Sequence, residues 1–159
     1  MDTLKRNLGC GKKILPGHVN IDRLGEPDLK LDLEKAKLPF KTGSVGHVEM
    51  IHVIEHIGNA ISLMREIHRV CKNGATVHLA YPIGNVSFAD PTHKQHWNIE
   101  IIEYFSRSDY LSIPKFELVS RELHSDKRIA FLPHFVRVII HFLTNRGFFE
   151  CDATLRVVK

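Results

Sequence analysis

A glycine turn close to the start of the chain constrains the fold more than any other part of this sequence. A short strand is expected over residues 6–8, and the turn follows directly at residues 9–11, with the sequence Gly-Cys-Gly. Glycine has no Cβ atom, so the backbone can turn sharply there and lie against a ligand. Asp22 and Asp32 stand at the ends of the next two expected strands. This order predicts a pocket for an adenosine-type ligand beside adjacent strands.

The pattern of apolar and turn residues predicts seven strands and three helices. The clearest helix has Asn59 as its N-cap, carries one apolar face, and is expected to end at Asn73-Gly74. A second helix is expected to begin near Asn98 and to reach Tyr110, and a third to fall within 131–149. The expected strands are 6–8, 19–22, 29–31, 45–51, 75–81, 116–123 and 153–158.

The connections between the first three strands are too short for ordinary crossover helices. Pro16 and Gly17 interrupt the first connection, and residues 23–27 form a loop in the second. Strands and helices alternate in the middle of the chain, and two strands come late, which predicts an α/β fold. We therefore expect a seven-stranded, mainly parallel sheet with an antiparallel edge strand, in which the early crossover helices are shortened or missing.

The composition predicts one soluble domain over residues 1–159. The chain is 43% hydrophobic and 25% charged, which is typical of a globular protein with one core. Its net charge of +4 is spread along the sequence, so nucleic acid binding is not indicated. No apolar signal precedes the glycine turn, and we expect a cytoplasmic location and no transmembrane segment. Cys10, Cys71 and Cys151 are scattered and odd in number, so we expect free thiols.

Several segments occur in an order that is typical of one enzyme family. They are NLGCG, VNID, LDLEKAKLPF, SVGHVEMIHVIEHI, LMREIHRVCKNGATVHLAYP and DPTHKQHW. In this order they resemble the class I S-adenosylmethionine-dependent methyltransferases, most closely the small members with LNLGCG and HVLEH. The resemblance implies a Rossmann-like sheet, S-adenosylmethionine as the cofactor and methyl transfer to an acceptor.

The resemblance also implies which residues hold the cofactor. The methionine moiety is expected at the glycine turn, the ribose at Asp22, and the adenine beside Asp32 and Leu33. The complete set of expected cofactor residues is Gly9, Cys10, Gly11, Asp22, Asp32, Leu33, Ile51 and His52. The chain departs from the family at Asn7, where an acid is usual, and at Lys13, where a third glycine is usual. It also departs at Gly46, near the start of the fourth strand, where an acid is common.

Two histidines are candidates for the base that takes the acceptor's proton. His56 follows the fourth strand and His93 follows the fifth, so both loops should open over the same sheet edge. A histidine near neutral pKa can accept a proton from a hydroxyl or amine. We expect His93 to be the base, with His56 as the second choice. The alternative is that both histidines only cap or pack in their loops.

Residues 52–56 also spell H-x-x-E-H, the inverted signature of some zinc proteases. That chemistry needs both histidines on one face of a helix, beside a glutamate. Here the first histidine ends a strand, and Asn59 caps the next helix only after the second histidine. We therefore expect no metal site, and a zinc hydrolase is an unfavoured alternative.

Residues 131–143 are apolar almost all round, with Arg137 as the only formal charge. The pattern favours a core helix that packs on the sheet between the last two strands. A lid over an apolar acceptor, a homodimer face or an interfacial membrane contact are the alternatives.

The sequence predicts an S-adenosylmethionine-dependent methyltransferase that acts on a small-molecule or glycan-like acceptor. A protein that binds the cofactor without turnover is the second hypothesis, because of the departures at Asn7, Lys13 and Gly46.

Overall fold

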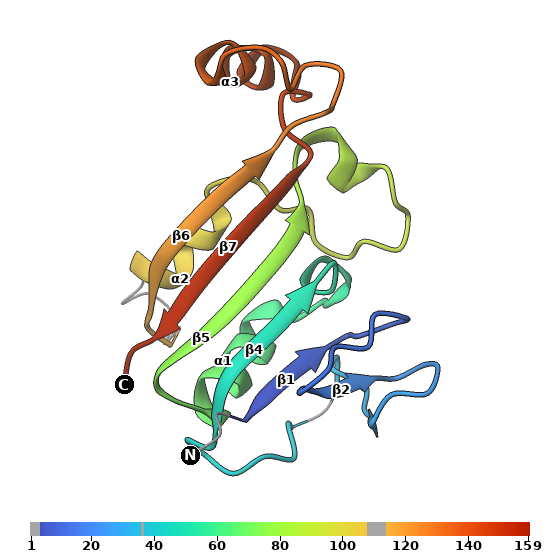
Figure 1. Ribbon diagram of the computed structural model, residues 1–159, viewed down its shortest axis with the longest axis vertical. Helices are drawn as coiled ribbons and strands as arrows, with labels where there is room; N and C mark the ends of the chain where they lie inside the picture. The colour runs from blue at the N-terminus through green and yellow to red at the C-terminus, as the bar shows by residue number, and fades with distance from the viewer. Residues whose placement is uncertain (1–3, 36, 108–113) are drawn as a thin grey trace.

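Seven strands form one sheet in the computed structural model, which describes residues 4–35, 37–107 and 114–159. The order across the sheet is β3-β2-β1-β4-β5-β7-β6 (Figure 1). All neighbours pair in parallel except β7, which is antiparallel to both β5 and β6. The predicted α/β sheet is confirmed, with its antiparallel strand inserted next to the edge. The strands are β1 (Lys5–Leu8), β2 (Val19–Asp22), β3 (Leu29–Lys30), β4 (Val45–Ile51), β5 (Cys71–Pro82), β6 (Phe116–His124) and β7 (Glu150–Val157).

Two helices cover one face of this sheet and lie behind it in Figure 1. The first, α1 (Ala60–Val70), buries its apolar side, and Asn59 caps it by accepting a hydrogen bond from Ser62 N at 3.0 Å. The second, α2 (Tyr104–Arg107), follows a 3₁₀ turn, η3 (Ile101–Glu103). The predicted second helix is therefore split, and its expected end at Tyr110 lies outside the described residues. Two further 3₁₀ turns are η1 (Ile54–His56) and η2 (Gly84–Phe88).

The prediction that the first helix ends at Asn73-Gly74 is wrong. The helix ends at Val70, and β5 begins at once with Cys71. Gly74 has φ +78° near the start of that strand, where the register against β4 shifts. A left-handed glycine suits an irregularity in a strand as well as it suits a helix end. Gly74 does adopt the left-handed conformation that the sequence predicted, but it does so within β5 and not at the end of the helix.

The missing early crossovers leave the other face of the sheet bare among the described residues (Figure 1). Side chains on β4 and β7 alternate between buried and partly exposed positions. The partly exposed positions carry a chain of hydrogen bonds: His78 contacts Glu49 at 2.8 Å and Asp152 at 3.1 Å, and His124 contacts Asp152 at 2.7 Å. Several of the chain's histidines therefore serve a water-facing sheet surface.

The prediction of a core helix within 131–149 is wrong. A helix is present, α3 (His134–Thr144), but none of its residues is buried. It lies beyond the ends of β6 and β7 (Figure 1), and Phe142 is 88% exposed. The loops on either side carry the helix past the sheet, and an apolar pattern alone cannot show whether anything covers it. Among the described residues, no helix has the length and apolar character needed to span a bilayer.

Candidate functional site

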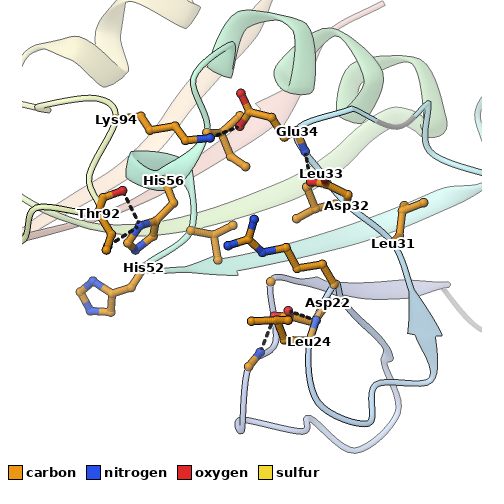
Figure 2. A pocket seen from close by; sticks show the side chains of 15 residues that line it. Asp22, Leu24, Leu31, Asp32, Leu33, Glu34, His52, His56, Thr92 and Lys94 are labelled. Carbon is orange, nitrogen blue, oxygen red and sulfur yellow. Dashed lines mark hydrogen bonds and ion pairs between the residues drawn. The ribbon is translucent and has the colours of Figure 1, made fainter.

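A cavity of about 420 Å³ lies at the carboxyl ends of the first strands (Figure 2). The sequence placed most of its expected cofactor residues here, together with the candidate base His56. Cys10 is buried and Ile51 stands in β4, and neither lines this cavity. The lining residues are Gly9, Gly11, Asp22, Arg23, Leu24, Leu31, Asp32, Leu33, Glu34, His52, Val53, His56, Ile57, Thr92 and Lys94.

The two glycines of the turn serve different purposes. Gly9 has φ +69°, and a Cβ atom there would lie 2.4 Å from Val53 Cγ2. Gly11 has φ +49°, and a Cβ atom there would meet nothing within 4 Å. Gly9 thus lets the turn pack against the end of β4, while Gly11 supplies a left-handed backbone beside open space. A bare backbone facing a cavity is suited to close approach by a ligand.

Asp22 holds the glycine turn in place. Its Oδ2 atom accepts a hydrogen bond from Gly11 N at 2.8 Å, and its Oδ1 atom accepts one from Leu24 N at 2.9 Å. Each carboxylate oxygen has a second lone pair, so Asp22 can still accept hydrogen bonds from a diol. The residue therefore both shapes the cavity and offers it acceptors.

Two buried asparagines anchor the loop between β1 and β2. Asn7 Nδ2 donates to Lys13 O at 2.8 Å and to Asn20 Oδ1 at 2.9 Å. Asn20 also accepts from Leu15 N at 2.8 Å and donates to Asp28 Oδ2 at 2.9 Å. These bonds fix a loop that has no crossover helix to support it, and Asn7 and Lys13 are two of the departures noted in the sequence.

The far wall of the cavity contains residues that sequence reasoning missed. Asp32 Oδ1 accepts a hydrogen bond from Glu34 N at 3.0 Å. The Glu34 carboxylate accepts from Gly58 N at 3.0 and 3.1 Å and lies 3.3 Å from Lys94 Nζ. Figure 2 shows this ion pair across one side of the cavity, away from Asp22. Glu34 and Lys94 are distant in sequence, so only the fold could bring them together.

His52 stands at the end of β4 in a left-handed conformation, with φ +54°. Its Nε2 atom lies 2.8 Å from Glu150 Oε2, and its Nδ1 atom lies 3.5 Å from Glu55 Oε1. The hydrogen bond with Glu55 and the charge of Glu150 raise the pKa of His52, against the opposing effect of burial. Left-handed φ values are uncommon outside glycine and often mark functional positions.

The two candidate bases lie against each other. The rings of His56 and His93 meet edge to face, with centroids 4.9 Å apart. His56 lines the first cavity and also a second one of about 580 Å³, which His93 lines as well. Their neighbour His96 stacks on Phe88 at 4.1 Å and lines neither cavity. The structure thus places His56 between the two cavities, with His93 beside it in the second.

The zinc-protease arrangement of H-x-x-E-H is not formed. The motif's only helical part is η1, a 3₁₀ turn of 3 residues, and His52 precedes it with a left-handed backbone. The two histidines of the motif therefore do not share a helix face, which that chemistry needs.

Comparison with known proteins points to one family. Residues 17–79 match the family model described as "Methyltransferase domain". The matched range begins after the glycine turn, so the turn is an independent observation. No curated protein matches the sequence significantly.

Solved structures share the fold at low sequence identity. An S-adenosylmethionine-dependent methyltransferase from Archaeoglobus fulgidus is 16% identical with a TM-score of 0.69, over 97% of this chain and 86% of that one. The [4+2]-cyclase SpnF is 14% identical with a TM-score of 0.67, over 99% and 76%. A chain from a complex with the Haloferax volcanii Trm112 methyltransferase activator is 14% identical with a TM-score of 0.64, over 99% and 83%.

These similarities establish the architecture, and the cyclase shows that the architecture alone does not fix the reaction. The strand order, the glycine turn and the family match agree with one another. Together they confirm the predicted resemblance: residues 17–79 match a methyltransferase domain, and the chain shares its fold with a solved S-adenosylmethionine-dependent methyltransferase.

Proposed function

We propose that the protein binds S-adenosylmethionine in the first cavity and transfers its methyl group to a hydroxylated small-molecule or glycan-like acceptor. The observation that carries this proposal is the joint placement of the glycine turn, Asp22 and Asp32 around one cavity. The cavity volume of about 420 Å³ lies within the range of small-ligand sites.

The residues of the cavity fit an adenosine ligand. The free lone pairs of Asp22 suit the ribose diol, and Gly11 offers open backbone to the methionine part. Only Oδ1 of Asp32 has a hydrogen-bond partner among the described residues, so Oδ2 can accept from an exocyclic amine. Leu31, Leu33 and Ile57 add apolar lining for a purine ring.

S-adenosylmethionine supplies a methyl group on a positively charged sulfur. A lone pair of the acceptor oxygen forms the new O–C bond, while the S–C bond breaks and its electron pair returns to sulfur. The acceptor's proton must also leave, and His56 and His93 are the candidates to take it. The chain's main contribution is to hold the acceptor in line, since positioning alone can supply much of the acceleration.

The second cavity is the expected acceptor site. It shares His52 and His56 with the first cavity, so a molecule bound there would lie next to the methyl donor. Its remaining lining includes Asp90 and His93, which suit hydrogen bonds to hydroxyl groups.

The test is production of S-adenosylhomocysteine from S-adenosylmethionine with a panel of sugars and other hydroxylated acceptors. The proposal predicts turnover with at least one class of acceptor, together with a gain of one methylene in the acceptor's mass. Tight binding of S-adenosylhomocysteine without turnover on any acceptor would contradict methyl transfer and support the non-catalytic hypothesis.

A further inference from the structure

A carboxylate and two imidazoles meet at the boundary between the two cavities. Glu55, His56 and His93 each offer one ligand atom, and the three atoms lie within 4.8 Å of one another. All three residues line the second cavity, and His56 also lines the first. We call these three residues the Glu-His-His cluster.

Glu55 is an unusual carboxylate for a protein interior. The residue is 1% exposed, and its Oε2 atom has no hydrogen-bond partner among the described residues. Within the described part of the chain, the one ionic contact of Oε1 is with His52 Nδ1, at 3.5 Å. A buried carboxylate oxygen without a partner is costly, and buried carboxylates usually pair with a cation or coordinate a metal.

Both histidines of the cluster are oriented by backbone carbonyls. His56 Nδ1 lies 3.2 Å from Thr92 O, and His93 Nδ1 lies 2.8 Å from Ser87 O. A carbonyl oxygen can only accept, so each Nδ1 carries a hydrogen, and Nε2 is the nitrogen of each ring that can bind a metal. Metal-bound histidines are held in this same way, by a hydrogen bond from the nitrogen that does not bind the metal.

The backbone holds the two parts of the cluster together. Lys94 N and Gln95 N both donate to Glu55 O, at 2.9 and 3.0 Å. The side chain of Gln95 donates to Gly58 O at 2.9 Å. The loop that carries His93 is therefore fastened directly to η1, which carries Glu55 and His56.

We propose that the Glu-His-His cluster binds one divalent transition-metal ion. Two imidazole nitrogens and one carboxylate oxygen suit zinc, cobalt or manganese better than magnesium or calcium, which prefer oxygen ligands. Small side-chain rotations would bring the three ligand atoms to bond lengths of about 2.0–2.2 Å. The ion would bind the Oε2 atom of Glu55, which otherwise has no partner among the described residues. This proposal differs from the sequence-based expectation of no metal site.

This site also suggests how the acceptor is activated, a step that rests on the proposed function. Three protein ligands leave coordination positions open toward the second cavity, where an acceptor hydroxyl can bind the ion. A metal-bound hydroxyl loses its proton to water more readily, and the resulting oxygen lone pair forms the bond to the methyl carbon. His56 and His93 then serve as ligands and not as bases, and the acceptor class is one with a hydroxyl oxygen that can coordinate a metal.

Metal binding can be tested without cofactor or acceptor. Protein stripped with EDTA is titrated with Co²⁺, and binding is followed by visible absorption and calorimetry. We expect one equivalent to bind, and Glu55→Gln to weaken binding at least about tenfold. His93→Gln should have the same effect, and it is the second variant if Glu55→Gln does not fold. His96→Gln is the matched control, because His96 uses the same Ser87 carbonyl at 2.9 Å but lies outside the cluster.

Two results would overturn the metal site. One is the absence of Co²⁺ binding, or equal binding by wild type and Glu55→Gln. The other is binding that Glu55→Gln preserves and His124→Gln removes, because His124, Glu150 and Asp152 form a separate cluster within 4.8 Å. Binding of S-adenosylhomocysteine measured in EDTA tests the cofactor cavity separately, so failure of either proposal can be recognised alone.

Discussion

The side-chain amide of Asn7 donates a hydrogen bond to Asn20 Oδ1 across 2.9 Å, with both residues buried. The same amide donates to Lys13 O at 2.8 Å, so it joins β1, β2 and the loop between them. The sequence marked Asn7 only as a departure from its family. The structure gives this departure a purpose, because an amide can donate two hydrogen bonds where a carboxylate can donate none.

Asn7→Asp should destabilise the protein, although it restores the residue usual in the family. The new carboxylate would face two acceptors, Asn20 Oδ1 and Lys13 O, with no donor to offer them. We expect a loss of about 1–3 kcal/mol in unfolding free energy, measured by urea denaturation. Asn98→Asp is the matched control: among the described residues the Asn98 side chain only accepts hydrogen bonds, from Glu100 N and Ile101 N, so the change should have little effect on stability. Equal stabilities for the two variants would contradict this view of the loop.

Gly9→Ala should weaken both folding and cofactor binding. The added Cβ would lie 2.4 Å from Val53 Cγ2, at a residue with φ +69°. Gly17→Ala has a similar φ of +74° but open space around it, so it separates backbone strain from the clash. We expect Gly17→Ala to cost about 1–2 kcal/mol, as left-handed alanine does, and Gly9→Ala to cost more. Thermal unfolding with and without S-adenosylhomocysteine measures both effects, and equal losses would contradict the packing role of Gly9.

The Glu66–Arg69 pair should make stability depend on pH in the acid range. Arg69 Nη2 lies 2.8 Å from Glu66 Oε2, and this hydrogen bond lowers the pKa of Glu66. A lowered pKa means that the stabilisation is fully present above the unfolded pKa of about 4.3 and is lost as the pH falls through the folded pKa. Glu66→Gln should therefore be less stable than wild type at pH 7, and the difference should shrink below about pH 4. A difference that stays constant between pH 7 and pH 3 would argue against the pair.

None of the three cysteines should react in the folded protein. Cys10, Cys71 and Cys151 are all buried, and burial raises the pKa of the Cys71 thiol to about 12. A thiol reacts as its thiolate, which would be scarce at pH 8. Titration with Ellman's reagent at pH 8 should give no fast phase in native protein and 3 thiols after denaturation. A fast-reacting thiol in the native protein would show that one of these side chains is accessible.

The homodimer expected through residues 131–143 remains a prediction, and α3 makes it testable. Phe135 and Phe142 are 65% and 88% exposed, so their replacement should not disturb the core. If two copies of the chain pair through α3, Phe142→Ser should lower the sedimentation coefficient and leave the unfolding temperature unchanged. If the wild-type protein sediments as a monomer at all concentrations, the homodimer prediction is wrong.

The sequence predicted the sheet well because its strands carry strong local signals. Five of the seven expected strands match to within two residues at each end, the fifth and the seventh begin earlier than expected, and the glycine turn falls where it was expected. The fifth strand and the first helix were less accurate at their junction, because Gly74 suits a strand irregularity and a helix end equally. The position of α3 could not be predicted, because its apolar pattern is the same whether or not another surface covers it.

The sequence could predict those residues of the candidate site that closely follow the end of a strand. Gly11, Asp22 and Asp32 belong to that class. Glu34 and Lys94 line the cavity and form an ion pair between loops that are distant in sequence. No local sequence pattern predicts such a contact. Glu55 was visible inside H-x-x-E-H, but its burial and its lack of a partner for Oε2 depend on the whole fold.

Isothermal titration with S-adenosylhomocysteine tests the central claim, that the first cavity is a cofactor site. Wild type should bind one equivalent, and Asp32→Asn should bind about tenfold or more weakly, because it can place an amide donor where Oδ2 of Asp32, which Glu34 N leaves free, would accept from the adenine amine. Glu117→Gln, the same change on an exposed β6 residue paired with Arg156, should bind as wild type does. The absence of binding by wild type at millimolar ligand, or equal affinity of wild type and Asp32→Asn, would contradict the claim.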